Sequence, residues 1–223
     1  MLDKSVRVLR ALEREGAATL AQLQVATGLP RATAHRLAAA LEQHGLVRRD
    51  GEGRYRLGLG LLALGRAAAD GFPLAELAHP ALRALRDDTG ESVQLFVREG
   101  DARRCVVSLQ SAHGLRWIVA EGALLPLAVG SAGKVLSGAT GEAGWVQSVE
   151  ERERGVASVS APVVDGIEGE VRAAVSVSGP VERLGRQPGR SVGDRVVAAA
   201  TTISTAIARA GYHPHRGAGG RGR

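Results

Sequence analysis

Apolar side chains recur at helical spacing at the start of the chain. Between Ser5 and Arg14, every third residue is apolar and charged residues stand between them, which predicts a helix with one apolar face. These apolar residues are Val6, Leu9 and Leu12. Gly16 ends this helix, and Thr19 with Gln22 matches a capping box, in which the hydroxyl and the amide side chain satisfy first-turn backbone groups. A second, short helix is therefore predicted to stop at Gly28.

A third helix is predicted after Pro30, which is tolerated at a helix start. Its apolar side consists of Ala34, Leu37, Ala38 and Leu41. At 100° per residue, the opposite side carries small and hydrogen-bonding residues, namely Arg31, Ala32, Thr33, His35 and Arg36. Short side chains allow close approach to a major groove, and the longer ones can reach base edges or phosphates. A merely solvated helix would be expected to carry Glu and Lys there.

A small hairpin is predicted directly after the third helix. Residues 46–49 and 54–57 alternate as strands, and the Asp-Gly-Glu-Gly sequence at 50–53 is typical of a turn. Its arginines are available to meet phosphate, and they are Arg48, Arg49, Arg54 and Arg56. Residues 1–58 are therefore predicted to form a winged helix-turn-helix domain that binds DNA.

The next segment, residues 59–72, is predicted to be a linker helix because Leu59, Leu62 and Leu64 repeat at near-helical spacing. It either joins two domains or closes the first domain as a surface helix. Gly71-Phe72-Pro73 marks the expected boundary.

Residues 73–210 have a mixed pattern. Helical periodicity over 74–88 and 191–210 flanks alternating segments at 92–98, 104–109 and 115–119, which predict antiparallel strands. Alternation in the second strand places Cys105, Val107 and Leu109 on one face. The fold class is therefore α+β, with an antiparallel sheet flanked by helices.

The charge of the chain is concentrated at its two ends. The net charge is +6, with 11 Lys and Arg against 6 Asp and Glu in residues 1–66, and 15 against 17 in residues 67–210. The tail, residues 211–223, adds three Arg and no acid, and we expect it to be disordered. A basic first domain beside a slightly acidic second one is typical of a polyanion-binding module attached to a part that does not touch nucleic acid.

Cysteine content and hydropathy indicate the compartment. The single cysteine, Cys105, excludes an intrachain disulfide framework and agrees with a reducing environment. No apolar run approaches the roughly 20 residues that a membrane span needs. A cytoplasmic location is expected.

The sequence VGSAGKV at residues 129–135 resembles two enzyme motifs but fails both on spacing. A P-loop requires Gly where Ala128 stands and Ser or Thr where Val135 stands. A nucleophile elbow around Ser131 requires Gly at Val129. The remaining interpretations are a glycine-rich helix start whose amides hold a carboxylate and a tight turn into a short helix.

Two later segments, 156–163 and 171–178, repeat one another. Ser158 and Ser160 alternate with valine in the first, as do Ser176 and Ser178 in the second. Period-two geometry places the serines on one face and the valines on the other. The serine face either lines a pocket for a small polar ligand or packs against a helix because serine is small.

Three stretches of the chain resemble the IclR family of bacterial transcription regulators. They are LDKSVRVLRALE near the start, GLPRATAHRLAAALEQHGLVRRDGEGRYRLG at 28–58, and VASVSAPV with AAVSVSGPVERL at 156–163 and 173–184. The resemblance covers residues 2 to about 210 and is strongest to the actinobacterial, NdgR-like branch associated with amino-acid metabolism. It implies a GAF-like effector domain after the linker helix, and a linker helix that packs against its partner in a dimer.

The resemblance also implies an effector site for a small organic acid or an amino-acid-related compound. Motif positions matching Ser131, Ala132, Ser148, Ser158, Ser176 and Ser178 line that site in such members. Members can have Asp at Ser148 and Cys at Ser158, so the identity of the ligand does not carry over. The family usually has a much longer segment between Lys134 and Trp145, and its helices cover the pocket. In this chain we expect that cover to be missing or reduced, leaving an open site or a domain that serves only in association.

These observations predict a homodimeric DNA-binding regulator with a pseudo-palindromic operator, and they leave open whether dimers pair into tetramers. Arg36 and Thr33 are expected at or near base edges, His35 and Arg31 next to them, and Arg54 and Arg48 on phosphate. One alternative is a constitutive regulator whose second domain binds no ligand; a remote alternative is an enzyme or acyl-binding protein. Trp117 and Trp145 are interpreted as core or lid residues in preference to ligand-stacking ones. No spacing suggests a metal site, and no cofactor is expected.

Overall fold

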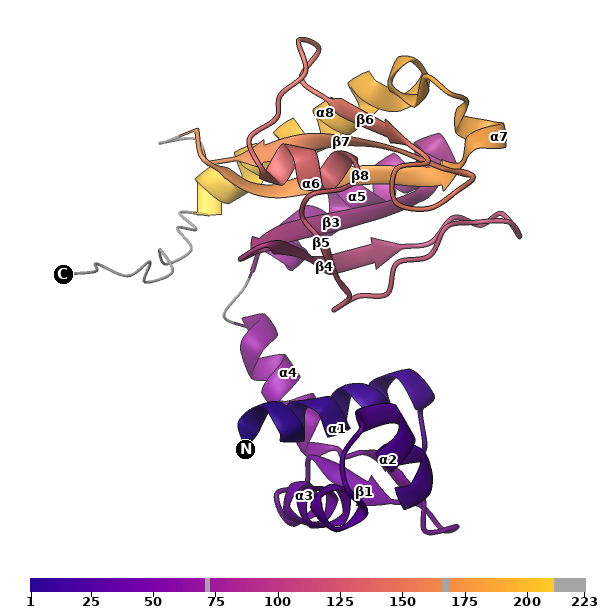
Figure 1. Ribbon diagram of the computed structural model, residues 1–223. Helices are drawn as coiled ribbons and strands as arrows, with labels where there is room; N and C mark the ends of the chain where they lie inside the picture. The colour runs from indigo at the N-terminus through magenta and orange to yellow at the C-terminus, as the bar shows by residue number, and fades with distance from the viewer. Residues whose placement is uncertain (71–72, 166–168, 211–223) are drawn as a thin grey trace, which may run out of the picture. The chain divides into compact units, whose positions relative to one another are not determined.

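The computed structural model describes residues 1–70, 73–165 and 169–210. It divides into two compact units, Met1–Gly71 and Phe72–Arg223, which are described separately (Figure 1). Two sequence predictions, the domain boundary at residues 71–72 and the basic tail at 211–223, lie outside the described residues. Within the described part of the chain, no helix is both long enough and apolar enough to cross a bilayer.

Three helices form the core of the first unit: α1 (Leu2–Glu15), α2 (Leu20–Thr27) and α3 (Arg31–Gln43). The predicted capping box is confirmed, because the Thr19 side chain accepts from Gln22 N and the Gln22 side chain accepts from Thr19 N at 2.8 Å. The predicted apolar face of α3 is also confirmed, and its four residues are buried against α1, α2 and the hairpin. This core fixes which side of α3 faces outward.

A two-stranded antiparallel hairpin, β1 (Val47–Arg49) and β2 (Tyr55–Leu57), follows α3. Val47 and Tyr55 are buried in the same core as the helices, which attaches the hairpin to them. Where the chain leaves the hairpin, the backbone at Gly58 lies against the backbone at Gly45. A Cβ on Gly58 would lie 2.1 Å from the carbonyl oxygen of Gly45. Only glycine fits there, so the start of the next helix is fixed against the end of α3.

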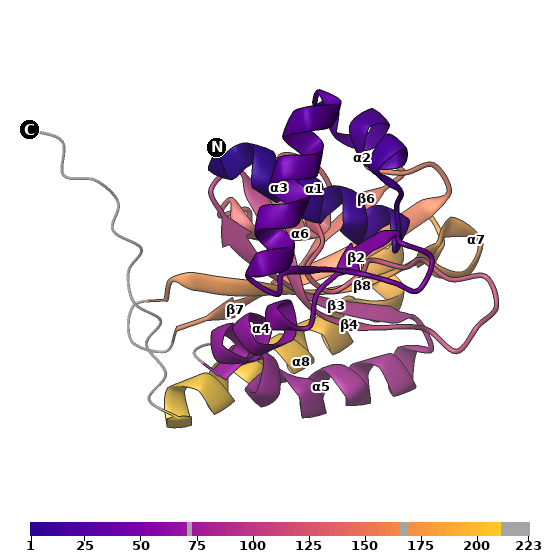
Figure 2. The ribbon, with the colours of Figure 1, turned by 90° about the horizontal axis from the view of Figure 1, so that it is seen from below.

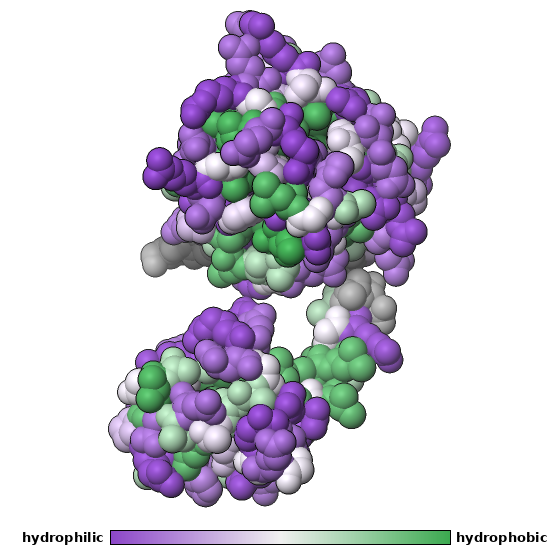
Figure 3. Space-filling view, turned by 90° about the vertical axis from the view of Figure 1, so that its right-hand side faces the viewer, coloured by the Kyte–Doolittle hydropathy of each residue, from purple (hydrophilic) through white to green (hydrophobic). Residues whose placement is uncertain are grey.

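Helix α4 (Gly60–Asp70) follows the hairpin directly. Its leucines are not buried in the first unit: Leu62 is 54% exposed and Leu64 is 60% exposed, and Leu59 just before the helix is 77% exposed. Figure 3 shows green, apolar atoms on the surface of α4. A helix with this much exposed apolar surface is typical of one that packs against another chain.

The second unit is a six-stranded antiparallel sheet with the order β5-β4-β3-β8-β7-β6. The strands are β3 (Ser92–Glu99), β4 (Ala102–Leu109), β5 (Leu124–Pro126), β6 (Val146–Val149), β7 (Val156–Val164) and β8 (Val171–Pro180). The helices are α5 (Leu74–Thr89), α6 (Ser131–Leu136), α7 (Val181–Leu184) and α8 (Pro188–Ala210). The predicted α+β class is therefore observed.

The two faces of the sheet have different cores. Helices α5 and α8 lie side by side along one face (Figure 2), over a large cluster of valines, leucines and isoleucines. The short helix α6 lies on the other face with a smaller cluster that includes Phe96, Cys105 and Val135. The valines that alternate with the serines in β7 and β8 face α5 and α8, so these serines face α6, as the period-two pattern predicts.

Two predictions for the strands are wrong. Residues 115–119 do not form a strand; the edge of β4 is paired instead by β5, with Arg103 opposite Leu125. Cys105 and Val107 do not share a face, because the register with β3 shifts at a bulge that leaves Val106 as an extra residue. Cys105 therefore joins the core under α6, whereas Val107 joins the core under α5 and α8.

Candidate functional site

The outward face of α3 is the first candidate site. Arg31, His35 and Arg36 are exposed, as is Ala32, and Thr33 is half-buried. The only acid of the helix is Glu42, in its last turn, and it pairs with Arg49 at 3.3 Å. The face is thus basic and built of short residues near its N-terminus, with longer donors beside them, which suits close approach to a polyanion.

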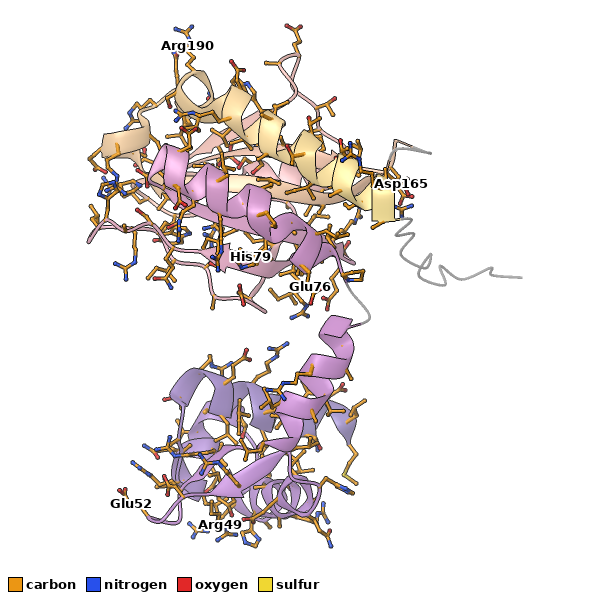
Figure 4. All side chains as sticks on the ribbon, turned by 180° about the vertical axis from the view of Figure 1, so that it is seen from behind. Arg49, Glu52, Glu76, His79, Asp165 and Arg190 are labelled. Carbon is orange, nitrogen blue, oxygen red and sulfur yellow. The ribbon has the colours of Figure 1, made fainter. Side chains whose placement is uncertain are left out.

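The hairpin turn is organised by one carboxylate. Asp50 Oδ1 accepts hydrogen bonds from the backbone N–H of Glu52 and Arg54, and its Oδ2 accepts from Arg54 Nε at 3.0 Å and Arg56 Nε at 2.9 Å. These interactions, led by the one from Arg56, hold the pKa of Asp50 well below its usual range. The hairpin of β1 and β2, called the wing from here on, therefore keeps a fixed, ionised carboxylate in its turn. Figure 4 labels Arg49 and Glu52 at this end of the unit.

The arginines of the wing are not equivalent. Arg54 is tied to Asp50 and Glu52, Arg56 to Asp50, and Arg49 to Glu42 while also lying over the Tyr55 ring at 4.7 Å. Arg48 is exposed, and no ion pair joins it to an acid in the described part of the chain. Of the two wing residues predicted to contact phosphate, Arg48 is free to do so, whereas Arg54 must share its charge with two carboxylates.

The second candidate site lies on the α6 face of the sheet. Cross-strand pairing aligns Ser178 with Ser158, and Ser158 with Ser148, so that hydroxyl groups from β8, β7 and β6 form a row. The start of α6 closes over this row, where Ser131 Oγ lies 2.7 Å from Ser158 Oγ and 2.8 Å from Ser160 Oγ. Serine is used here for its hydrogen bonds, not only for its small size.

A small cavity lies between α6 and the sheet. The space in it that admits the centre of a water-sized sphere is about 40 Å³. All six residues predicted to bind an effector line this cavity, and they are Ser131, Ala132, Ser148, Ser158, Ser176 and Ser178. The structure brings these residues together, and their effector role stays a prediction.

The same cavity is lined by residues that the sequence did not indicate. They are Gln94, Phe96, Arg103, Trp117, Val119, Leu125, Gly130 and Arg152. The sequence did contain a signal for one of them. Arg103 lies two residues before Cys105 on the same strand, so alternation places both side chains on the same, buried face. Trp117 and Arg152 come from two loops that meet over the cavity, with the Arg152 guanidinium 4.8 Å from the centre of the Trp117 ring.

The electrostatics of the cavity are set by its two arginines. Arg103 is only 3% exposed, and burial together with the nearby charge of Arg152 lowers its pKa to about 10. Burial also lowers the pKa of Arg152. Loss of solvation is the larger cause of both shifts, and at Arg152 the charge of Glu153 opposes it only in part.

One of the two interpretations of the start of α6 was that it holds a carboxylate, and the structure places one of the protein's own there. Glu151 Oε2 accepts a hydrogen bond from Gly130 N at 3.2 Å, and its other oxygen is paired with Lys134. The Gly130 amide and the Lys134 charge are therefore already engaged. Within the described residues, no cluster of His, Cys, Asp and Glu is arranged to hold a metal ion.

Comparison with known proteins identifies both units. The family model described as the IclR helix-turn-helix domain matches residues 1–51, and that described as the bacterial transcriptional regulator IclR C-terminal matches residues 66–143 and 139–205. These families contain regulators, which indicates a non-enzymatic protein.

Individual relatives agree with the family models. The glycerol operon regulatory protein of Streptomyces coelicolor is 31% identical over 83% of this chain and 87% of its own length. The regulator KipR of Bacillus subtilis is 32% identical over 57% of this chain and 51% of its own, so the chain spans about half the length of some curated relatives it matches. A crystal structure of an IclR homologue from Microbacterium hydrocarbonoxydans, complexed with 4-hydroxybenzoate, has the same fold, with a TM-score of 0.78 at 22% identity over 94% of this chain and 99% of that one.

Proposed function

Because the chain belongs to the IclR family of bacterial transcriptional regulators, we propose that it binds specific DNA as a cytoplasmic homodimer under the control of a small acid. Helix α3 enters the major groove, and the wing lies along the adjacent backbone. The observation that carries this proposal is the outward face of α3. Arg31, His35 and Arg36 are exposed there, and the helical turns that contain them have no Asp or Glu.

On this proposal, the residues of α3 contact base edges and the arginines of the wing contact phosphate. Arg36 and Thr33 read or approach base edges, with His35, Arg31 and Ala32 beside them, because they lie on the face of α3 opposite its buried core. Arg48 contacts phosphate without an internal competitor, and Arg54 contributes a weaker phosphate contact because Asp50 and Glu52 share its charge.

The homodimer is supported by the apolar surface of α4. Leu59, Leu62 and Leu64 are all more than half exposed in the isolated chain, and a symmetric partner would bury them. Two-fold symmetry implies a pseudo-palindromic operator, and pairing of dimers into tetramers is compatible with it. A Leu62→Lys variant should sediment as a monomer, whereas Arg66→Gln, at an exposed position of the same helix, should remain a dimer.

The effector part of the proposal is supported by the serine-lined cavity. The related structure complexed with 4-hydroxybenzoate is that of an acid-binding homologue, which favours an organic acid or an amino-acid-related compound here. The cavity is small, with about 40 Å³ open to the centre of a water-sized sphere, so a small aliphatic acid fits better than an aromatic one. The C-terminal family model matches in two segments that meet at residues 139–143, which supports a shortened segment after Lys134 and leaves the cover of the cavity to its loops. Membership of the branch associated with amino-acid metabolism is part of the same proposal.

DNA binding is tested by selecting bound fragments from genomic DNA with the full-length chain, then measuring gel shifts on the selected site and on random DNA. Arg36→Ala should weaken binding to the selected site by about 10- to 100-fold, the range for loss of one base contact, and binding to random DNA far less. Arg14→Ala removes the same charge from an exposed position of α1 and should change neither strongly. Equal loss of Arg36→Ala binding on both DNAs would remove its base-reading role. Failure to enrich any fragment would contradict specific DNA binding, and a non-regulatory function would then be the better interpretation.

A further inference from the structure

The cavity under α6 has an imbalance of charge that the proposed effector role does not by itself explain. Its lining contains two guanidinium groups, Arg103 and Arg152, and neither Asp nor Glu. No ion pair joins either arginine to a carboxylate among residues 1–70, 73–165 and 169–210. The acid whose charge acts on Arg152 is Glu153, which is exposed and lies outside the lining.

The cavity also has an excess of hydrogen-bond donors. Three buried donor atoms of the lining have no partner: Gln94 Nε2, Arg103 Nε and Trp117 Nε1. The nitrogen atoms of Arg103 and Trp117 can only donate, and the oxygen of Gln94 already accepts from Ser178 Oγ at 2.8 Å, which leaves its NH₂ group free. Buried donors are almost always satisfied in folded proteins, so three in one cavity require acceptors that water or a ligand supplies there.

A purely structural role explains only some of the hydrogen bonds of the Arg103 side chain, and it does not explain its buried charge. Its Nη1 donates to the carbonyl oxygen of Val129 at 2.7 Å and to that of Pro126, which holds the loop that leads into α6. This accounts for one edge of the guanidinium. It does not account for the unpartnered Nε, for the absence of a counter-ion, or for a second arginine close enough to repel the first.

We propose that this cavity selects a small dianion, a dicarboxylate of two to four carbons. The inference rests on the proposed effector function and adds the charge of the ligand to it. One carboxylate pairs with Arg103 and accepts from Gln94; the other pairs with Arg152 and accepts from Trp117. Two negative charges neutralise both guanidinium groups, whereas a monocarboxylate leaves one of them without a counter-charge.

The size of the cavity limits the acid. Because only about 40 Å³ is open to the centre of a water-sized sphere, a short dicarboxylate fits better than a long one. Serine hydroxyls along the sheet, such as Ser158 and Ser176, complete the polar wall and can donate to the same oxygens.

The test is isothermal titration calorimetry of the full chain with malonate and succinate, each against its half-amide. The half-amide has the same size and one charge fewer. Each dicarboxylate should bind at least tenfold more tightly than its half-amide. In Arg152→Gln this preference should fall to less than threefold, while half-amide affinity changes little, because only the second charge loses its partner.

The matched control is Arg154→Gln, which removes an exposed arginine two positions further along the same loop and outside the lining. It should keep the full preference. Arg152 is the primary test position because it is half-buried, whereas Arg103 also holds a loop and its variants can misfold.

Several outcomes overturn the inference: equal affinity for a dicarboxylate and its half-amide, no binding of any dicarboxylate, equal effects of Arg152→Gln and Arg154→Gln, or sulfate and phosphate binding as tightly as the dicarboxylates. The failure of this inference is distinguishable from that of the effector role. If acetate, propionate or a neutral amino acid binds and two charges give no preference, the effector role of the cavity is supported and its selectivity for a dianion is wrong. If none of these compounds binds while operator binding persists, both the effector role and the dianion selectivity are wrong, and a constitutive regulator is favoured.

Discussion

Helix α8 contains two glycines that leave room for one aromatic side chain. A Cβ built on Gly193 would lie 2.4 Å from Trp145 Nε1, and one on Gly189 would lie 2.0 Å from Trp145 Cη2. Both distances are far below van der Waals contact, so the indole lies directly on the helix backbone. We therefore predict that Gly193→Ala destabilises the second unit, although alanine is the better helix former.

Two opposing terms set the size of this effect. Replacing glycine by alanine inside a helix stabilises by about 1 kcal/mol, whereas forcing a packed side chain from its place costs about 1–3 kcal/mol. Because the indole also lies against Gly189 and cannot move in that direction, we expect the clash to prevail, with a net loss of up to about 2 kcal/mol. In a Trp145→Ala background the clash is absent, and Gly193→Ala should instead stabilise by about 1 kcal/mol.

The assay is urea unfolding followed by tryptophan fluorescence. Both tryptophans of the chain, Trp117 and Trp145, belong to the second unit, so the signal reports on that unit alone, and Trp117 remains as a probe in the Trp145→Ala background. Ala198→Gly, at an exposed position of α8, calibrates the helix term. The reasoning is refuted if Gly193→Ala stabilises the chain that retains Trp145, or if its effect has the same sign and size in both backgrounds.

Two further predictions concern buried groups of the second unit. Glu91 is 4% exposed and is bound by Arg183 through two hydrogen bonds of 2.6 and 2.8 Å, so Arg183→Gln should leave a buried carboxylate uncompensated and lower the free energy of unfolding by about 2 kcal/mol. Arg186→Gln, at a largely exposed arginine, should cost under about 0.5 kcal/mol in the same urea titration, and equal losses would contradict the argument. Burial raises the pKa of the Cys105 thiol to about 12, so iodoacetamide should not label the native chain at pH 8 but should label it readily in urea. Labelling of the native chain at the rate of a free cysteine would show that the thiol is accessible and ionised.

The helix-turn-helix could be predicted from the sequence because its signals are local. The capping box of Thr19 and Gln22 lies within one turn, and the apolar face of α3 is a matter of spacing along a single helix. The exposed face of α3, with Arg36 and His35, follows from the same spacing. The ion pairs of the wing were not predicted, because which arginine reaches Asp50 depends on the path of the turn.

Strand positions were predicted less well where pairing is decided by distant residues. The alternation at 115–119 is real, and Val119 is buried, but these residues lie over the α6 face, while the edge of β4 pairs with β5. Likewise, a one-residue bulge at Val106 reverses the face of every position before it, and nothing in the local pattern of β4 indicates where that bulge occurs.

The sequence by itself determined the two kinds of domain, the outward face of α3 and the serine faces of β7 and β8, because each depends on the period of helices or strands. Only the tertiary structure decided the character of the cavity. Arg103, Gln94, Trp117 and Arg152 come from two strands and two loops, and their side chains meet only when the sheet, α6 and the loops have packed together. Charge and unpartnered donors in a cavity are properties of that packing, so the proposed charge of the ligand rests on the fold and not on the order of residues.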